Sequence, residues 1–344
     1  MTTIFPAEWA PQSAVQLTWP RPEGDFAQHF GAVERCFVDI AVAITRHQNL
    51  IVACGEDVGQ LRRSLLDAGV PAARLQLHAV PANDVWARDH GPITVLRDGR
   101  PVHLDFVFNG WGGKFDATLD NHVTRRLAAL GALRAPVESL DFVLEGGAIE
   151  SDGRGTLLTT ERCLLAPTRN PQLDKAQIEA RLKEWLGLTR VLWLRHGDLI
   201  GDDTDGHIDT IARFCDAETI AYQACDDETD AHYADLKAME HELQQLRTAD
   251  GQPYKLVPLP LPAAIHDGDP DYGGRRLPAG YPNFLIINGA VLVPTYGDVH
   301  DAVALARLRP CFPDREVVGI DCRPLIRQYG SLHCVTMLIP SAPQ

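Results

Sequence analysis

Hydrophobic residues recur along the chain at two spacings, one typical of helices and one typical of buried strands. Val33, Phe37, Ala41 and Ile44 lie three or four positions apart, which predicts an amphipathic helix within residues 25–47. The apolar run LIVACG follows this helix and has the continuous hydrophobicity of a strand that is buried on both faces. An early helix thus leads directly into a strand of the core.

The same order of elements returns further along the chain. Asp-Gly or Asn-Gly pairs at residues 98–99, 152–153 and 288–289 each separate two apolar runs, which predicts three tight β-hairpins. Helical spacing recurs between the strands, over residues 57–69, 120–130, 173–186, 230–247 and 301–308. Each helix is followed by another apolar run, such as VLWL, YKLVPL or EVVGID, which is typical of a strand.

This repetition indicates about five ββαβ-like units of roughly 65 residues each, whose amino-acid sequences are only weakly similar to one another. We expect a single α/β domain over residues 1–344, in which the units surround an axis. Two α/β domains are the alternative, but the chain has no Ser/Gly-rich linker. The Pro/Gly-rich segment 258–282 is interpreted as a long functional loop.

Composition and charge narrow the class of protein. Hydrophobic residues make up 45% and charged residues 23% of the 344 positions, as in a soluble globular protein. The net charge of −14 disfavours a nucleic-acid partner and favours a cationic ligand. No apolar run approaches the roughly 18 residues of a membrane span, and MTTIFPAEWAPQ lacks the order of a secretory signal. We therefore expect a cytoplasmic protein without a membrane partner and, because dimers are the commonest assemblies, a homodimer.

Four short motifs place acids, a histidine or a cysteine after apolar strands, where α/β folds gather their chemistry. They are NDVWARDHGP with Asp89, LEGGAIESDG with Glu145, GDDTDGHIDTIARF with His207 and Asp209, and GSLHCVTM with Cys334. If the units surround an axis, these distant motifs converge on one central pocket. The repeat therefore predicts a single candidate site.

Each motif taken alone also has an ordinary explanation. Asp89 could pair with the neighbouring Arg88, and Glu145 could accept hydrogen bonds from loop amides. The eight cysteines contain no CxxC pair, so Cys334 alone would be a small buried apolar residue. Only the combination of the motifs favours a catalytic site.

A metal site is not favoured by the sequence. His207 and Asp209 have the HxD spacing that puts two ligands on one face of a strand, but no third His or Cys stands in a suitable context. A calcium loop would begin at Gly201 and end at Ala212, so both essential acids are missing. We expect neither a metal nor an organic cofactor.

Taken together, a thiol, an imidazole and three carboxylates favour chemistry on a guanidinium group. A thiol beside an imidazole can act as a thiolate nucleophile. The carboxylates of Asp89, Glu145 and Asp209 are ill suited to an acyl oxyanion, which needs hydrogen-bond donors. They suit a flat, delocalised cation, whose parallel N–H groups carboxylates bind in bidentate fashion.

The motifs WxRDxGP, FNGWGGKF, LEGGxxExDG, GHIDTIARF and the late HC resemble the agmatine deiminase family, which is related to bacterial peptidylarginine deiminases. The resemblance covers residues 1–340 with the motifs in the right order. It implies the pentein fold, a five-bladed α/β propeller of ββαβ units around a central pocket. It also implies hydrolysis of agmatine to N-carbamoylputrescine and ammonia without a metal or an organic cofactor.

The resemblance also implies a role for each site residue. Cys334 would be the nucleophile that forms a covalent amidino-thioether. His207 would protonate the departing ammonia and then activate water. Asp89 and Asp209 would bind the guanidinium, and Glu145 would orient His207 and contact the same cation.

Further residues would recognise the rest of the substrate. Trp86 and Trp111 would line the channel against the aliphatic part of the substrate, with ordinary aromatic core packing as the alternative. Asp203 would receive the distal amine. The chain reads YGSLHC where the family has a glycine-rich run, and Lys114 lies where specificity could change. Free or C-terminal peptidyl arginine is therefore an alternative substrate, and a non-catalytic propeller that binds guanidines or polyamines is an alternative of another class.

Overall fold

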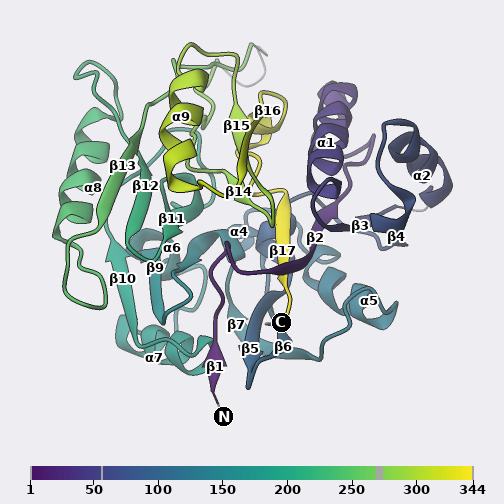
Figure 1. Cartoon of the computed structure of the whole chain (residues 1–344), viewed down its shortest axis with the longest axis horizontal. Coiled ribbons are helices and arrows are strands. Elements are labelled where there is room, and N and C mark those ends of the chain that lie inside the picture. Colours follow the sequence, from purple (N-terminus) through teal and green to yellow (C-terminus); the bar gives the residue numbers. More distant parts are fainter. Residues whose placement is uncertain (1, 56, 269–273, 343–344) are drawn as a thin grey trace.

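The computed structural model describes residues 2–55, 57–268 and 274–342. Over this part of the chain the strands form five small sheets of three or four strands, none of them closed. Figure 1 shows α1, α2, α7, α8 and α9 toward the rim of the molecule, with β17 near its middle. The predicted α/β class is confirmed.

Three of the sheets share one strand arrangement. In each, two consecutive strands pair antiparallel, and a third strand then pairs parallel to the second. The strands are β8 (Ile149–Ser151), β9 (Thr156–Thr160) and β10 (Arg190–Leu194) in one sheet, β11 (Ala212–Asp216), β12 (Thr219–Gln223) and β13 (Lys255–Leu259) in the next, and β14 (Leu285–Ile286), β15 (Ala290–Thr295) and β16 (Glu316–Asp321) in the third.

The other two sheets add one strand to the same arrangement. One contains β5 (Ile93–Arg97), β6 (Arg100–Val107) and β7 (Val137–Val143), with β1 (Thr3–Ile4) at its edge. The other contains β17 (Thr336–Pro340), β2 (Gln12–Thr18) and β3 (Asn49–Cys54), with β4 (Leu75–Ala79) at its edge. Because β17 pairs with β2, the last strand of the chain completes a sheet that the first residues began.

Helices connect the parallel strands, because a parallel pair needs a crossover. They are α1 (Phe30–Thr45), α2 (Val58–Asp67), α5 (Val123–Ala129), α6 (Glu161–Leu164), α7 (Lys175–Leu186), α8 (Tyr233–Gln245) and α9 (Asp301–Leu308). Two short helices complete the set: α3 (Ala87–His90) lies between β4 and β5, and α4 (Gly110–Gly113) precedes α5 in the crossover from β6 to β7. In α7, a capping box formed by Asp174 and Gln177 fixes the start, and Ile178, Leu182 and Leu186 face the core.

The predicted hairpins and helices agree with these elements. The turn between β5 and β6 has Asp98 at φ +46° and Gly99 at φ +76°, the left-handed pair that a tight hairpin requires. Helix α9 and strand β16 have the predicted bounds. Residues 269–273 of the loop predicted over 258–282 lie outside the described residues.

Two segments that carry site residues are turns and not strands. Residues Ile208–Thr210 form a 3₁₀ helix, so the two-residue strand period does not apply to His207 and Asp209. Strand β17 begins at Thr336, so Cys334 lies in the turn before the strand. In both places the backbone forms a turn before the next strand begins. The pattern of apolar residues alone does not distinguish such a turn from the end of a strand.

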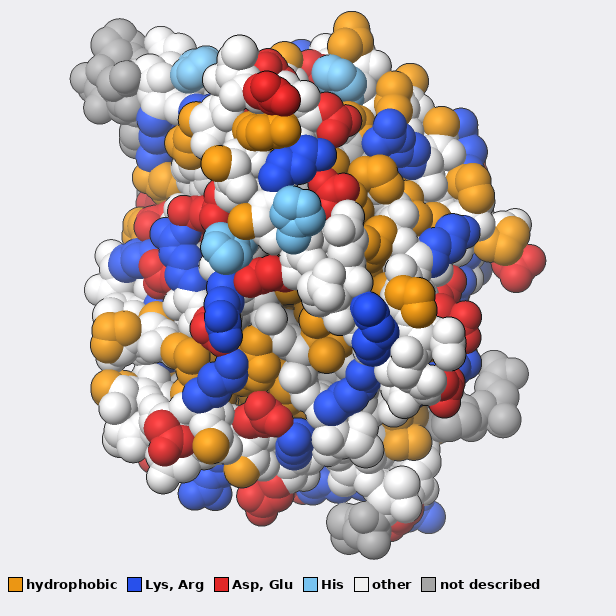
Figure 2. Space-filling model, turned by 90° about the vertical axis from the view of Figure 1, so that its left-hand side faces the viewer, with side chains coloured by type: hydrophobic (Ala, Val, Ile, Leu, Met, Phe, Trp, Pro, Cys, Tyr) orange, Lys and Arg blue, Asp and Glu red, His pale blue; other side chains and the backbone are white. Residues whose placement is uncertain are grey.

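Charged side chains of both signs cover the surface (Figure 2). On the face shown in Figure 2, Lys and Arg side chains are interspersed with Asp and Glu. Over the described residues, no helix is long and apolar enough to cross a membrane.

Candidate active site

The five predicted catalytic residues all lie in connections between one sheet and the next. Asp89 is on α3 between β4 and β5, and Glu145 lies between β7 and β8. His207 and Asp209 lie between β10 and β11, and Cys334 lies between β16 and β17. All five are buried, with at most 4% of any residue exposed.

Gly147 shows that three of these side chains meet. A methyl group on its Cα would lie 2.5 Å from His207 Nδ1, 2.9 Å from Asp89 Oδ1 and 3.1 Å from Asp209 Oδ2. Any larger residue at this position would push these three side chains apart, which explains why the second glycine of the LEGG motif is needed. The amide of Gly147 also donates to Asp89 Oδ1 over 3.1 Å and fixes that carboxyl group.

Cys334 approaches the same group of side chains. Its Sγ lies 4.0 Å from Asp209 Oδ2 and 3.3 Å from Asn283 Nδ2. Asn283 Nδ2 also donates to the Asp209 carbonyl over 3.2 Å, so one amide positions both residues. Sequence reasoning missed a role for Asn283, although it lies in the fifth connection, between β13 and β14, and the repeat itself pointed there.

Asp89 and Cys334 line a pocket together with the three residues that were predicted to recognise the rest of the substrate. Trp86, Trp111 and Asp203 line it, and its empty space of about 410 Å³ opens to solvent. Trp111 Nε1 donates to Asp89 Oδ2 over 3.0 Å, so this ring both lines the pocket and orients a carboxyl group. Trp86 and Trp111 also pack in the largest hydrophobic cluster, so both interpretations of these rings describe real contacts.

Burial sets the protonation of the groups in the pocket. Burial, with Asp209 and Glu145 nearby, raises the pKa of Asp89 well above its ordinary value. Burial and the carboxylates of Asp209 and Asp89 likewise raise the pKa of the Cys334 thiol well above its ordinary value. Burial lowers the pKa of His207 to about 4. Near pH 7 the imidazole and the thiol are therefore neutral.

Arg169 forms a buried ion pair with Glu145. Its Nε donates to Glu145 Oε1 over 2.8 Å, and its Nη1 donates to Asp205 Oδ2 over 2.7 Å. Burial raises the pKa of Glu145 and Arg169 opposes that shift. No local pattern marks this pair in the sequence, because a lone arginine is usually a surface residue.

One group of donor atoms in the described chain converges closely enough for a metal ion. Atoms of Glu145, Cys163 and His207 all lie within 4.8 Å of one another. The guanidinium of Arg169 on Glu145 opposes a further cation there. Neither ring nitrogen of His207 has a hydrogen-bond partner among the described residues, so the imidazole is available for proton transfer.

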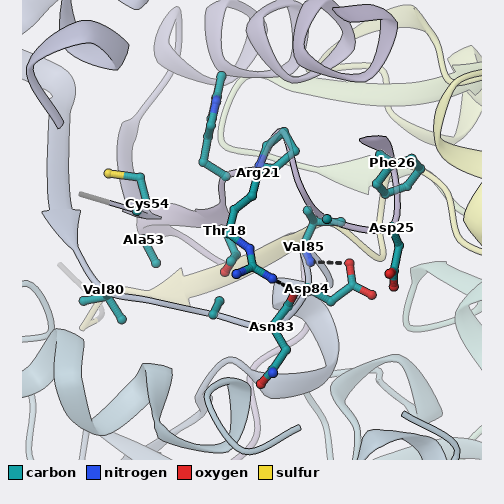
Figure 3. A pocket seen from close by; sticks show the side chains of 15 residues that line it. Thr18, Arg21, Asp25, Phe26, Ala53, Cys54, Val80, Asn83, Asp84 and Val85 are labelled. Atoms are coloured by element: carbon teal, nitrogen blue, oxygen red, sulfur yellow. Dashed lines mark hydrogen bonds between the residues drawn. The ribbon is translucent and has the colours of Figure 1, made fainter. Parts of the chain in front are cut away.

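The outer part of the pocket carries three more carboxylates. Asp203 Oδ1 lies 3.1 Å from Lys114 Nζ, so its charge already has a partner. Asp25 and Asp84 also line this pocket and line an adjoining one, where Figure 3 shows Asp84 accepting from the Val85 amide. Burial, with the charges of Asp25 and Asp120, raises the pKa of Asp84 to about 7.

Comparison with known proteins gives a family. Residues 4–340 match the family model described as Porphyromonas-type peptidyl-arginine deiminase. An agmatine deiminase from Stutzerimonas stutzeri is 35% identical, over 98% of this chain and 95% of that protein. A crystal structure from Porphyromonas gingivalis, provisionally named arginine deiminase, is 57% identical with a TM-score of 0.91 and covers 99% of both chains. A substrate-bound C. jejuni agmatine deiminase with a Cys-to-Ser change is 34% identical with a TM-score of 0.90, over 99% of this chain and 97% of that one. The chain therefore belongs to the Porphyromonas-type peptidyl-arginine deiminase family.

Proposed function

We propose that this protein hydrolyses agmatine to N-carbamoylputrescine and ammonia. One observation carries the proposal: the buried Asp89 carboxyl group shares a pocket with the Cys334 thiol and has no Lys or Arg partner among the described residues. Its one ion-pair neighbour there is His207, whose Nδ1 lies 3.6 Å away. A cationic substrate would supply the missing positive charge. Relatives named agmatine deiminase, one of them with substrate bound, support this substrate.

Asp89 and Asp209 would bind opposite edges of the guanidinium. A carboxylate accepts two parallel N–H groups of this flat cation, and two carboxylates fix its plane. Because Asp209 Oδ2 lies 4.0 Å from Cys334 Sγ, a guanidinium held there places its central carbon near the sulfur. The positive charge would also lower the pKa of Asp89 and of the Cys334 thiol, so the substrate itself would activate the nucleophile.

Two half-reactions would then follow. In the first, the sulfur of Cys334 forms a bond to the guanidinium carbon and a C–N bond breaks. The proton of the thiol passes through His207 to the departing nitrogen, which leaves as ammonia. In the second, His207 takes a proton from water, the resulting hydroxide attacks the amidino carbon, and the C–S bond breaks to leave a ureido product. One water is consumed for each ammonia released, and the thiol is restored.

The five sheets would be the blades of a pentein propeller around this pocket. Five ββαβ-ordered units support this arrangement, and each of the five connections between sheets contributes a residue to the site. The four predicted motifs account for four connections, and Asn283 accounts for the fifth.

The far end of the pocket favours an amine over a carboxylate. Among its lining residues in the described chain are Asp25, Asp84 and Asp203, of which Asp203 pairs with Lys114, and no lysine or arginine lines it. An arginine substrate would bring its carboxylate into this acidic opening at an electrostatic cost. The alternative is a deiminase of free or C-terminal peptidyl arginine, which the family description and the provisional name of the P. gingivalis structure favour. A non-catalytic binding propeller would not need the thiol.

One assay separates these functions. Formation of ureido product and release of ammonia would be measured with agmatine, with free arginine and with a peptide that ends in arginine. We expect kcat/KM for agmatine to exceed both others by about tenfold or more, the cost of one mismatched charge. A preference for either arginine substrate would overturn the choice of agmatine, and no turnover of any of the three would leave the binding function.

A further inference from the structure

His333, the residue before Cys334, lies between two carboxylates. Its Nδ1 is 2.6 Å from Asp209 Oδ2 and its Nε2 is 2.8 Å from Glu8 Oε2. All three residues are buried, with His333 only 1% exposed. A neutral imidazole has a single N–H and can donate to only one of these carboxylates, whereas an imidazolium can donate to both.

Glu8 belongs to a wider cluster of buried charges. Its Oε2 lies 3.0 Å from Arg213 Nη2 and 3.5 Å from Arg88 Nη2. Arg213 Nε in turn donates to Glu150 Oε2 over 2.8 Å. We call these groups the buried charge cluster, which comprises Glu8, Arg88, Glu150, Asp209, Arg213 and His333.

With its three carboxylates ionised, the charges of this cluster balance when His333 is protonated; burial raises the pKa of one of them, Glu150, and Arg213 opposes that shift. Three carboxylates face two guanidinium groups, so a neutral imidazole would leave a buried net charge of −1, and an imidazolium brings the sum to zero. An uncompensated buried charge is costly. Burial would raise the pKa of Glu8, but Arg213, His333 and Arg88 together lower it. Burial would also raise the pKa of Asp209, but the hydrogen bond and the charge of His333 outweigh it and lower that pKa.

We propose that His333 is a positioning residue that donates from both ring nitrogens, to Asp209 and to Glu8, and so holds Asp209 ionised and aimed at the substrate guanidinium. This inference rests on the proposed function of Asp209. His333 would not touch the substrate and would act through Asp209 alone. The pocket and the buried charge cluster would therefore share one residue, Asp209.

Several other charged groups lie near His333 and Asp209, and together with them they set the pH dependence of activity. Asp209 also interacts with His207 and Arg213 and with the thiol of Cys334, and its charge raises the pKa of Asp89. Arg88 interacts with Glu8, Asp209 and Glu150. His333 is the member of this set that bonds Asp209 and Glu8 at once.

The first test is the pH profile of His333→Gln. Glutamine keeps a donor for Asp209 but carries no charge, so the pKa of the buried Asp209 should rise. We expect the acid limb of kcat/KM to move to higher pH by about one unit or more and to steepen, because Asp209 must then lose a proton together with Asp89. The loss should appear mainly in KM. His103→Gln is the matched control, because His103 is equally buried, bonds Thr94 instead of a carboxylate and has a pKa lowered by burial to about 4. An unshifted limb with a uniform loss of activity would show that His333 is merely structural.

The second test uses the wild-type protein and does not depend on activity. Neutron diffraction from crystals in deuterated buffer near neutral pH locates the deuterons on the ring. We expect a deuteron on both Nδ1 and Nε2 of His333 and none on the Asp209 or Glu8 carboxylates. A bare ring nitrogen, or a deuteron on either carboxylate, would overturn the inference. If no guanidine compound is hydrolysed, the proposed function fails while this result still decides the protonation of His333.

Discussion

Asp89 and Glu8 are both buried carboxylic acids beside the same active site, yet their electrostatic surroundings are opposite. Glu8 contacts two guanidinium groups and the ring of His333, and its pKa is lowered although burial acts against this. Asp89 contacts an indole N–H, a backbone amide and the ring of His207, and its pKa is raised well above its ordinary value. Burial is therefore common to both, and the cationic partner makes the difference.

The comparison separates the framework of the site from its binding function. In the buried charge cluster, the protein supplies every countercharge itself, so those carboxylates hold elements together. In the pocket, Asp89 is held in place by neutral donors only, so its countercharge must come from a ligand. Asp209 lies between the two groups and receives its partner from His333.

The largest effect is expected at the nucleophile. Cys334→Ser should lower ammonia release from agmatine by about 10³-fold or more, because the serine hydroxyl is a far weaker nucleophile than a thiolate. Its melting temperature should stay close to that of the wild type. Cys311→Ser, at a half-exposed cysteine away from the pocket, should keep full activity. Turnover that persists in Cys334→Ser would exclude the covalent mechanism.

The next effect is expected on stability, in the buried charge cluster. Arg213→Met leaves Glu8 and Glu150 without their shared partner and should lower the free energy of unfolding by about 3–5 kcal/mol. Urea unfolding measures this change. A loss below about 1 kcal/mol would mean that Glu8 and Glu150 do not need the charge of Arg213. The difference between Glu8 and Asp89 would then no longer be explained by cationic partners.

Asp89→Asn should show the reverse pattern. The amide cannot form a charged pair with guanidinium, so kcat/KM for agmatine should fall about 10²-fold, which corresponds to about 2.7 kcal/mol. The free energy of unfolding should stay the same or rise, because a buried carboxyl group without a cationic partner has been removed. Wild-type kcat/KM in this variant would refute the role of Asp89 in binding.

The smallest effect is expected at Asp203. Because Lys114 already pairs with its partly exposed carboxylate, Asp203→Asn should raise KM for agmatine by only a few-fold, about 1 kcal/mol or less. Steady-state kinetics would show this, with kcat unchanged. A loss as large as that of Asp89→Asn would restore Asp203 as the main site for the distal amine.

Local spacing along the chain predicted the elements well, because periodicity is a local property. The helix Asp301–Leu308 and the strand Glu316–Asp321 have no competing pattern and were predicted with their observed bounds. The turns that contain His207 and Cys334 were not predicted, because such turns depend on contacts with distant segments.

The motifs brought Asp89, Glu145, His207, Asp209 and Cys334 together, and the structure places Asp89 and Cys334 in the lining of one pocket, with the other three buried beside them. The buried charge cluster could not be predicted in the same way. Glu8 and His333 are 325 positions apart, and neither residue lies in a pattern that marks a charge as buried. A sequence gives the identity of an ionisable residue but not its countercharge, which only the fold supplies.

Calorimetry of agmatine binding tests the central claim that the substrate supplies the countercharge of Asp89. The catalytically inactive Cys334→Ser variant would be titrated at pH 7 in buffers that differ in their heat of ionisation. Because Asp89 has a raised pKa before binding and forms an ion pair afterwards, we expect protons to be released when agmatine binds, and tighter binding as the pH rises. A heat of binding that is the same in every buffer, with an affinity independent of pH, would contradict the account.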